Sequence, residues 1–410
     1  MTDRLYYTDS FLHEFEGRVL SVADQAGRVA VTLDRSAFYP TSGGQVSDTG
    51  WLEVLSAGSE TARLRVNDVA EDEPSGDVLH IVEGDTSVLR PGAQVRGLID
   101  ADRRRDHMQQ HTGQHVLSAA FEKLYSFSTV SFHMGDESCT IDLAADSVNA
   151  KQLQSAERLA NEVIADDRPV EIRFAPPDEA QSMGVRKIPA AEREKLRLID
   201  IRDFDLNACG GTHVRSTGQI GSILLRKTEK VKQGVRVEFF CGLRAVRTAR
   251  RDFETLTESA ALFSTHIWEV PQQVRNSQEE TKSSQKAQHR LLEEVAELQA
   301  ERMLRSAEQR GNSRLIARYF AGRDLSFIKM LAQKLTKNPA VVALLACGGT
   351  QPSLVFAQTP GLASDMGALM KQTVQALGTR GGGNRDMAQG GAPSGERAES
   401  VLVDAARTIG

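Results

Sequence analysis

The sequence has no long apolar run, no basic-then-apolar start and only four cysteines in 410 residues. A membrane-spanning helix needs about 18 or more consecutive apolar residues, and a secretory signal needs a charged start followed by an apolar stretch. We therefore expect no membrane association. The cysteines are too widely spaced to suggest a disulfide framework, which favours a reducing, cytoplasmic compartment.

Lysine is absent from residues 1–95, where sixteen Asp and Glu outnumber seven Arg and give about 7 − 16 = −9. Residues 226–251 are the opposite, with nine Lys and Arg against two Glu, or 9 − 2 = +7. Such a segment can neutralise phosphates although the whole chain carries −5. A solvated helix and hairpin would explain the same charges. The candidate nucleic-acid contacts here are Arg226, Lys227, Lys230 and Lys232.

Two short segments offer metal ligands in pairs. His111 and His115 lie four residues apart in a segment that predicts a helix over 105–123, so they share one helix face. Gly113 opposes that helix by about 1 kcal/mol. Thr112 follows the first histidine where a zinc peptidase needs Glu, which disfavours that class. Two polar histidines on a helix surface are the plainer explanation of this pair.

The second segment is Cys209-Gly210-Gly211-Thr212-His213, which is too rich in glycine for a regular helix or strand. Glycines allow the tight backbone path by which Cys209 and His213 reach one ion. A buried apolar cysteine explains neither the glycines nor the histidine. Together the two segments supply four ligands, the number that a tetrahedral Zn²⁺ takes, and we expect one zinc ion per chain.

The patterns along the chain predict an α+β multidomain protein. Residues 1–95 contain alternating segments at 17–22, 28–33, 51–55, 62–69, 78–82 and 94–99, which predict a small N-terminal β-barrel. Residues 96–242 form a zinc-binding α+β core, with 176–200 helical or irregular. Residues 243–314 are a helical linker or dimer arm, and residues 315–410 are a C-terminal α/β domain.

Glycine-rich segments occur in both end domains. Gly43, Gly44 and Gln45 lie in a predicted barrel loop whose glycines permit close approach to a ligand; a plain turn is the alternative. Residues 379–391 are expected to form a loop between two helices. Such loops bind phosphates through free backbone N–H groups, but a flexible loop would have the same composition.

Four motifs occur in a fixed order: Phe-Tyr-Pro-x-x-Gly-Gly-Gln-x-x-Asp-x-Gly (38–50), His-x₃-His (111–115), Cys-Gly-Gly-Thr-His (209–213) and Gly-Gly-Gly-x-Arg-Asp-Met-Ala-Gln-Gly-Gly (381–391). This set resembles the freestanding alanyl-tRNA editing proteins, the AlaX family, and the editing half of alanyl-tRNA synthetase. The barrel opens the chain, so no aminoacylation domain and no ATP are expected. Ser42 departs from many relatives, which have another Gly there, and Ser131 lies where some synthetase editing sites carry Gln.

The resemblance implies hydrolysis of the ester in tRNA(Ala) mischarged with serine or glycine. It implies zinc held by His111, His115, Cys209 and His213. The glycines of the turn also permit the backbone N–H groups of Gly210, Gly211 and Thr212 to stabilise negative charge on the reacting carbonyl. By family position, the candidates for amino-acid contact are Thr112, Gln114, Ser131 and His133, beside Gly43, Gly44 and Gln45. The C-terminal domain would bind tRNA, with Arg380 and Arg385 as candidates, and a homodimer would form through this domain and the linker.

Two other functions fit parts of the sequence. A tRNA- or synthetase-binding module with a structural zinc would hydrolyse nothing. Threonyl-tRNA synthetase carries a similar zinc motif, so editing of Ser-tRNA(Thr) is a second possibility. The segment 381–391 favours the alanine system.

Overall fold

The computed structural model describes residues 1–25, 27–55, 62–72, 75–185 and 195–409. The chain divides into two compact units, residues 1–258 and 259–410, and each is described here by itself. None of the helices in the described ranges combines the length and apolar character needed to cross a membrane.

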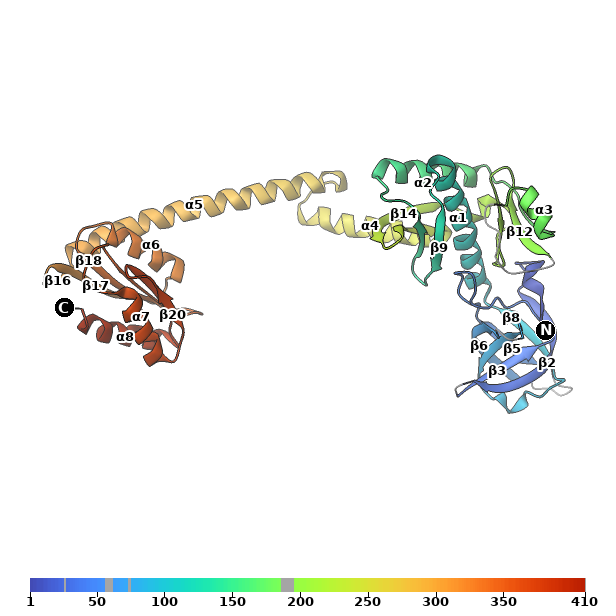
Figure 1. The fold of residues 1–410 in the computed structure, drawn as a ribbon, viewed down its shortest axis with the longest axis horizontal. Helices are drawn as coiled ribbons and strands as arrows, with labels where there is room; N and C mark the ends of the chain where they lie inside the picture. The colour runs from blue at the N-terminus through green and yellow to red at the C-terminus, as the bar shows by residue number, and fades with distance from the viewer. Residues whose placement is uncertain (26, 56–61, 73–74, 186–194, 410) are drawn as a thin grey trace. The chain divides into compact units, whose positions relative to one another are not determined.

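A closed six-stranded barrel forms the start of the first unit (Figure 1), which confirms the barrel predicted from the alternating pattern. Inward side chains such as Leu33, Leu52 and Leu64 are fully buried. Gly97 is required by the packing, because a Cβ there would lie 2.2 Å from the ring of Phe15. In spatial order the strands are β2 (Glu14–Gln25), β3 (Arg28–Leu33), β7 (Val78–Glu83), β6 (Ala62–Glu71), β5 (Gly50–Val54) and β8 (Gln94–Ile99).

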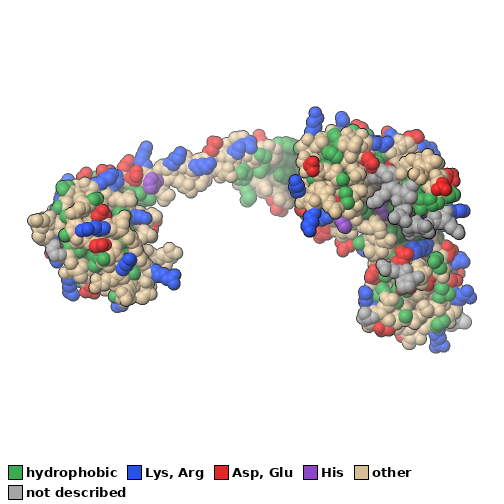
Figure 2. Space-filling view, in the orientation of Figure 1, with side chains coloured by type: hydrophobic (Ala, Val, Ile, Leu, Met, Phe, Trp, Pro, Cys, Tyr) green, Lys and Arg blue, Asp and Glu red, His purple; other side chains and the backbone are tan. Residues whose placement is uncertain are grey.

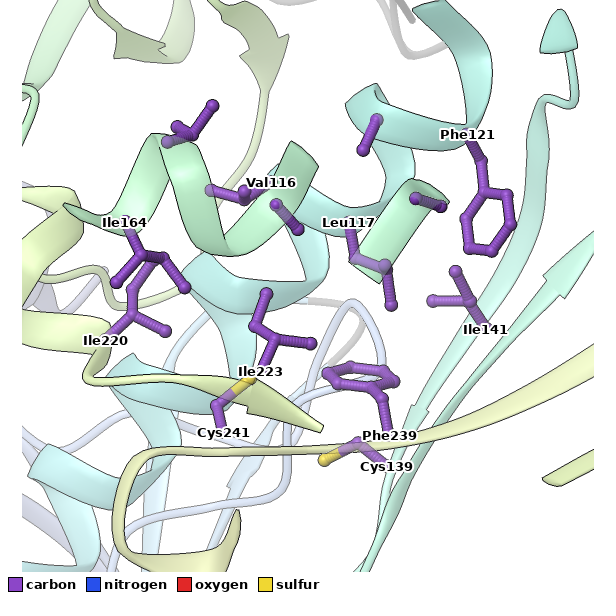
Figure 3. Packing of buried hydrophobic residues seen from close by; sticks show 14 of the residues in the cluster. Val116, Leu117, Phe121, Cys139, Ile141, Ile164, Ile220, Ile223, Phe239 and Cys241 are labelled. Atoms are coloured by element: carbon purple, nitrogen blue, oxygen red, sulfur yellow. The ribbon is translucent and has the colours of Figure 1, made fainter. Parts of the chain in front are cut away.

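Helix α1 (Ala101–Tyr125) directly follows the barrel, and most of its side chains from Gln110 to Phe121 are buried. Gly113 lowers the helix propensity of this segment, but packing requires a glycine there, because a Cβ would lie 2.2 Å from Cys241 Sγ. Figure 3 shows Val116, Leu117 and Phe121 of α1 among the buried side chains of this core. The helix packs against α2 (Ala150–Ala165) and against the sheet β14 (Ile223–Val231), β15 (Gly234–Cys241), β10 (Cys139–Leu143) and β9 (Thr129–Met134).

A second, three-stranded sheet corrects the expectation for residues 176–200. Its strands are β11 (Val170–Ala175), β12 (Leu196–Ile201) and β13 (Asp205–Ala208), all antiparallel. Only α3 (Pro177–Ser182) is helical in the expected segment, and residues 186–194 lie outside the described ranges. Leu196, Leu198 and Ile199 are buried. β13 ends at Ala208, immediately before the Cys-Gly-Gly-Thr-His segment.

Helix α4 (Gly242–Leu262) follows β15, and α5 (Val270–Arg305) is a 36-residue helix with Pro271 in its first turn. Six strands in the order β16–β17–β18–β19–β21–β20 form the sheet of the second unit. α5 and α6 pack in one hydrophobic cluster with the sheet, whereas α7 and α8 pack in another, so helices cover both faces. The remaining bounds are β16 (Glu308–Arg310), β17 (Ser313–Phe320), α6 (Leu325–Thr336), β18 (Val341–Cys347), β19 (Ser353–Gln358), α7 (Met366–Leu377), β20 (Gly381–Gly383), β21 (Met387–Gly391) and α8 (Gly395–Arg407).

The glycine-rich segment after Thr379 is a β-hairpin rather than the expected loop. Gly381, Gly383 and Gly390 lie where a Cβ would come within 2.7 Å of neighbouring backbone or side-chain atoms. The glycines therefore allow β20 and β21 to pair and to pack under α7. Gly382 and Gly391 of the same strands have open space where a Cβ would lie, so close packing explains only three of the five glycines.

Candidate metal centre

The structure brings His111, His115, Cys209 and His213 together, with one potential ligand atom from each lying within 4.8 Å of all the others. Cys209 Sγ is 3.4 Å from His111 Nε2 and 3.4 Å from His213 Nε2. The three histidines are buried, with 2–3% of their surface exposed. Two histidines come from one face of α1 and the other two residues come from the turn after β13. The predicted pairs therefore meet in one cluster.

Each imidazole in this cluster has a polar partner for its Nδ1 atom. Gln45 Oε1 accepts the backbone N–H of Thr212 at 3.1 Å, and the same oxygen lies 2.7 Å from His111 Nδ1. Because that oxygen can only accept, His111 carries its proton on Nδ1 and leaves Nε2 free. His115 Nδ1 faces Asp205 Oδ2 at 3.4 Å, and His213 Nδ1 faces Thr112 Oγ1 at 3.1 Å.

Such outward partners are typical of metal-binding histidines, because they fix the ring and the tautomer. Here they direct the three Nε2 atoms to the side on which Cys209 lies. Asp205 also adds a carboxylate behind His115, which increases the basicity of that ligand. The donor set of three imidazoles and one thiolate, with its polar partners in place, therefore fits a metal ion of the zinc type.

The electrostatics of the cluster prepare Cys209 for metal binding. Burial raises the pKa of the Cys209 thiol, but the neighbouring His111 and His213 outweigh burial, so the pKa lies well below its ordinary value. Burial lowers the pKa of His213 to about 3. Burial also opposes the protonation of His115, but Asp205 and Cys209 raise its pKa to about 9. Metal binding would require Cys209 as a thiolate and His115 as a neutral imidazole, so it would release the protons that these groups carry.

Close packing explains why the Cys-Gly-Gly-Thr-His segment has glycine at position 211. A Cβ at this position would lie 2.1 Å from His111 Cε1 and 2.3 Å from His111 Nδ1. Gly210 is different, because the nearest atom to a Cβ there is Tyr7 Oη at 3.6 Å, an ordinary contact. Only Gly211 is needed for the turn to approach the ring of His111.

A cavity of about 480 Å³ opens beside the cluster, and His111, His115 and Cys209 form part of its wall. Of the candidate contacts, Gly43, Gln114, Ser131 and Gly210 also line it. Gly44 is packed under Phe132, where a Cβ would lie 2.4 Å from the carbonyl oxygen of that residue. Gln45 and Thr112 are fully buried behind the histidines and hold their Nδ1 atoms.

Ser131 and His133 alternate with Phe132 along β9. The ring of Phe132 faces His111, with ring centroids 5.3 Å apart, so the side chains of Ser131 and His133 leave the strand on the other face. There the hydroxyl of Ser131 donates to Asp142 Oδ2 at 2.8 Å, and His133 is exposed. Ser131 thus contributes to the cavity wall near the strand backbone.

The backbone N–H groups of the turn are largely engaged. The N–H of Gly211 points at Cys209 Sγ at 3.4 Å, and the N–H of Thr212 donates to Gln45. Within the described ranges no hydrogen bond involves the N–H of Gly210, which lines the cavity. Of the three predicted oxyanion donors, Gly210 is thus the one whose N–H has no partner in the described part of the chain.

Four polar side chains of the cavity wall were not predicted from the sequence: Glu122, Ser128, Thr129 and Asn207. Asn207 Oδ1 is buried and has no hydrogen-bond partner among the described residues. Its position two residues before Cys209 is the feature of the sequence that could have placed Asn207 near the site. Ser128 and Thr129 carried no signal, because residue type alone does not show which strand borders a cavity.

The basic candidates lie in two places. Arg226 pairs with Asp252 and Lys227 pairs with Glu229 at 2.8 Å, while Lys230 and Lys232 are exposed near the end of the β14–β15 hairpin. In the second unit, Arg380 and Arg385 are exposed beside and within the glycine-rich hairpin. Figure 2 shows basic and acidic side chains interspersed over the visible face, so charge alone marks no extended basic surface in that view.

Two family models of tRNA-synthetase domains each match a part of this chain. "Threonyl and Alanyl tRNA synthetase second additional domain" matches residues 196–237, which include the Cys-Gly-Gly-Thr-His segment. "tRNA synthetases class II (A)" matches residues 5–103, which include the barrel.

Among known proteins, the alanyl-tRNA editing protein AlaX-L of Pyrococcus horikoshii is 30% identical over 95% of this chain and 94% of its own length. The chain therefore belongs to the alanyl-tRNA editing protein family. Alanine–tRNA ligases of Thermococcus kodakarensis and Pyrococcus abyssi are each 32% identical, but the chain spans only 44% and 42% of their lengths. The solved C-Ala domain of Aquifex aeolicus alanyl-tRNA synthetase matches 25% of the chain at 18% identity, with a TM-score of 0.24 that carries no structural argument.

The two glycines of the turn give a matched pair of variants. Gly211→Ala is expected to destabilise the first unit by about 1–3 kcal/mol, because the new methyl group overpacks the buried ring of His111. Gly210→Ala is expected to change stability by no more than about 0.5 kcal/mol. Urea unfolding of both variants checks this, and equal losses would contradict the close approach assigned to Gly211.

Proposed function

We propose that this member of the alanyl-tRNA editing family acts in trans and hydrolyses the aminoacyl ester of tRNA(Ala) mischarged with serine or glycine. The observation that carries the proposal is the meeting of His111, His115, Cys209 and His213 at the wall of an open cavity. A cluster that only stabilised the fold would need no cavity beside it. Family membership supplies the substrate class.

The metal in this proposal is one Zn²⁺ per chain, held by those four residues. The set of three imidazoles and one thiolate suits zinc, and four protein ligands complete a tetrahedral site. When bound, the ion would add positive charge at the cavity wall and fix the turn that carries Gly210. Gln45, Thr112 and Asp205 hold the three rings in place.

The chain's own groups would then bind and orient the ester. Water adds to the ester carbonyl, the ribose oxygen leaves with a proton, and the products are the free amino acid and tRNA. The free N–H of Gly210 is placed to donate to the carbonyl oxygen as negative charge develops there. Gly211 and Thr212, with their N–H groups engaged, position the turn. No covalent nucleophile is required for this activated ester.

Gln114 is the best-placed candidate for recognising the serine hydroxyl. It is buried and lines the cavity, and its Nε2 donates to Ser118 Oγ at 2.8 Å. Its Oε1 has no hydrogen-bond partner among the described residues and would accept a hydrogen bond from the substrate. A site built to bind a hydroxyl rejects the analogue that lacks it by about 10⁴–10⁵-fold, because polar groups remain unpaired. Alanine would be rejected in this way, whereas glycine, which also lacks the hydroxyl, would have to be accepted on steric grounds.

The basic residues are proposed to bind the body of the tRNA. Arg380 and Arg385 in the second unit, with Lys230 and Lys232 in the first, would contact phosphates. We also propose that the chain forms a homodimer through the helical linker and the C-terminal domain. Each lost phosphate contact reduces the salt dependence of binding by about one unit of slope. A double Arg380→Ala, Arg385→Ala variant with an unchanged slope would remove these arginines from the interface.

Cys209→Ala tests the function and the metal together. The variant is expected to lose bound zinc and to deacylate Ser-tRNA(Ala) at least about 100-fold more slowly, since even outer-shell changes cost about 10–100-fold. Cys347→Ala removes a buried thiol far along the chain and is the matched control, which should keep its zinc. Zinc content and release of labelled serine are the measurements.

A Cys209→Ala protein without metal but with full activity would refute the proposed role of the cluster. Wild-type protein that hydrolyses neither Ser-tRNA(Ala) nor Gly-tRNA(Ala) would favour a non-catalytic tRNA-binding module. Faster hydrolysis of Ser-tRNA(Thr) than of Ser-tRNA(Ala) would show that the protein edits mischarged tRNA(Thr).

Gln114 and Ser131 provide a second matched pair at the cavity. Gln114→Ala is expected to slow Ser-tRNA(Ala) deacylation by about 10-fold or more while Gly-tRNA(Ala) changes less, because a single hydrogen bond to the hydroxyl is lost. Ser131→Ala should affect both substrates little, since its hydroxyl bonds Asp142 on the other face of β9. A serine-specific loss in Ser131→Ala instead would reverse the assignment.

A further inference from the structure

A second, smaller cavity of about 210 Å³ lies against the same turn as the metal cluster. Ala208, Cys209 and Gly210 line both this cavity and the larger one, so the turn separates two adjoining spaces. We call the smaller space the rear cavity. Its other lining residues are Arg4, Tyr7, Ser42, Glu71, Leu196 and Arg197.

Arg197 gives the rear cavity an excess of positive charge. Its side chain is 7% exposed, its Nη1 donates to the carbonyl oxygen of Cys209 at 2.6 Å, and its Nε donates to the carbonyl oxygen of Tyr7 at 2.9 Å. No carboxylate within the described ranges forms an ion pair with it. Arg4, by contrast, pairs with Glu71. Apart from Cys209, which belongs to the metal cluster, the charged side chains that line the cavity are thus two cations against one anion.

Tyr7 supplies an aromatic ring near both guanidinium groups. Arg4 and Arg197 each lie 5.6 Å from the centroid of its ring, and its hydroxyl accepts a hydrogen bond from Arg4 Nη1 at 3.1 Å. Ser42, the residue that departs from the family pattern, is exposed at the same cavity, and no described residue hydrogen bonds to its hydroxyl.

These features match the chemistry of an unpaired nucleotide. Proteins bind single-stranded nucleic acid by stacking bases on aromatic rings in positively charged grooves. A base could stack at Tyr7, and a phosphodiester could accept from the Ser42 hydroxyl in the positive potential of Arg197. In the proposed function the larger cavity holds the aminoacyl ester beside the metal cluster. An adjoining subsite in the rear cavity would therefore bind the next nucleotide of the same tRNA chain.

We propose that the rear cavity binds the nucleotide that precedes the terminal adenosine of the tRNA, with Tyr7 as its stacking surface. This inference rests on the proposed function, because it places the ester in the larger cavity. It adds a subsite that requires no metal contact and none of the basic residues singled out from the sequence.

The experiment compares Tyr7→Ala with Tyr7→Phe on two substrates of different length, seryl-adenosine and the seryl ester of the dinucleotide CpA. Tyr7→Ala is expected to lower kcat/KM for the dinucleotide ester by about 5- to 150-fold, the range that base–aromatic stacking contributes. Seryl-adenosine should be hydrolysed at the wild-type rate. Tyr7→Phe keeps the ring and should retain the preference for the longer substrate.

An equal loss on both substrates would overturn the proposal and give Tyr7 a structural role or a contact with the terminal adenosine. No loss on either would overturn it as well. Binding of unacylated CpA and of adenosine, followed by NMR titration of the full chain, separates this inference from the proposed function. Wild-type protein should bind CpA more tightly, and Tyr7→Ala should abolish the difference even if no ester is hydrolysed.

Discussion

The buried ion pair between Arg104 and Asp48 joins the two parts of the first unit on which the site depends. Both side chains are fully buried. Arg104 also donates to the carbonyl oxygens of Ser10 at 2.8 Å and Ala37 at 2.6 Å. Removing one partner of a buried pair typically costs about 3–5 kcal/mol, because the other charge is left uncompensated. Arg104 lies on α1 and Asp48 lies in the glycine-rich barrel segment, so the pair fixes that segment against the helix.

The consequence of this link is the position of Gln45. Gln45 lies three residues before Asp48. Its carboxamide oxygen accepts a hydrogen bond from the backbone N–H of Thr212 and contacts His111 Nδ1. The barrel segment, α1 and the Cys-Gly-Gly-Thr-His turn therefore meet at one amide group. A cluster assembled from segments almost a hundred residues apart needs such a common reference, because loop residues alone rarely hold ligands in a fixed geometry. The glycine at position 211 then allows the final approach.

Much of this could be predicted from the sequence. Alternating patterns gave the barrel strands, and ligand spacing gave the four residues that the structure brings together. These signals are local and depend on residue type. The three-stranded sheet was partly missed because Leu196–Ile201 is a short apolar run after an irregular segment, where periodicity does not separate strand from helix. The hairpin of residues 381–391 was missed because glycines that permit close packing look like loop glycines.

The cavity contacts were harder to predict for a different reason. Whether Ser131 or Phe132 faces the histidines depends on the register of β9 against β10, and a shift of one residue reverses the faces. Arg197 gave no signal either, since one arginine in a strand is ordinary until its burial and its bond to the Cys209 carbonyl are known. Partners that come from distant parts of the chain decide both roles.

X-ray absorption at the zinc edge of the purified full-length chain tests the central claim most directly. The account predicts one zinc per chain with one sulfur neighbour at about 2.3 Å and three nitrogen neighbours at about 2.0–2.1 Å. A zinc shell of oxygen without sulfur, or a protein that retains no zinc after purification, would contradict it.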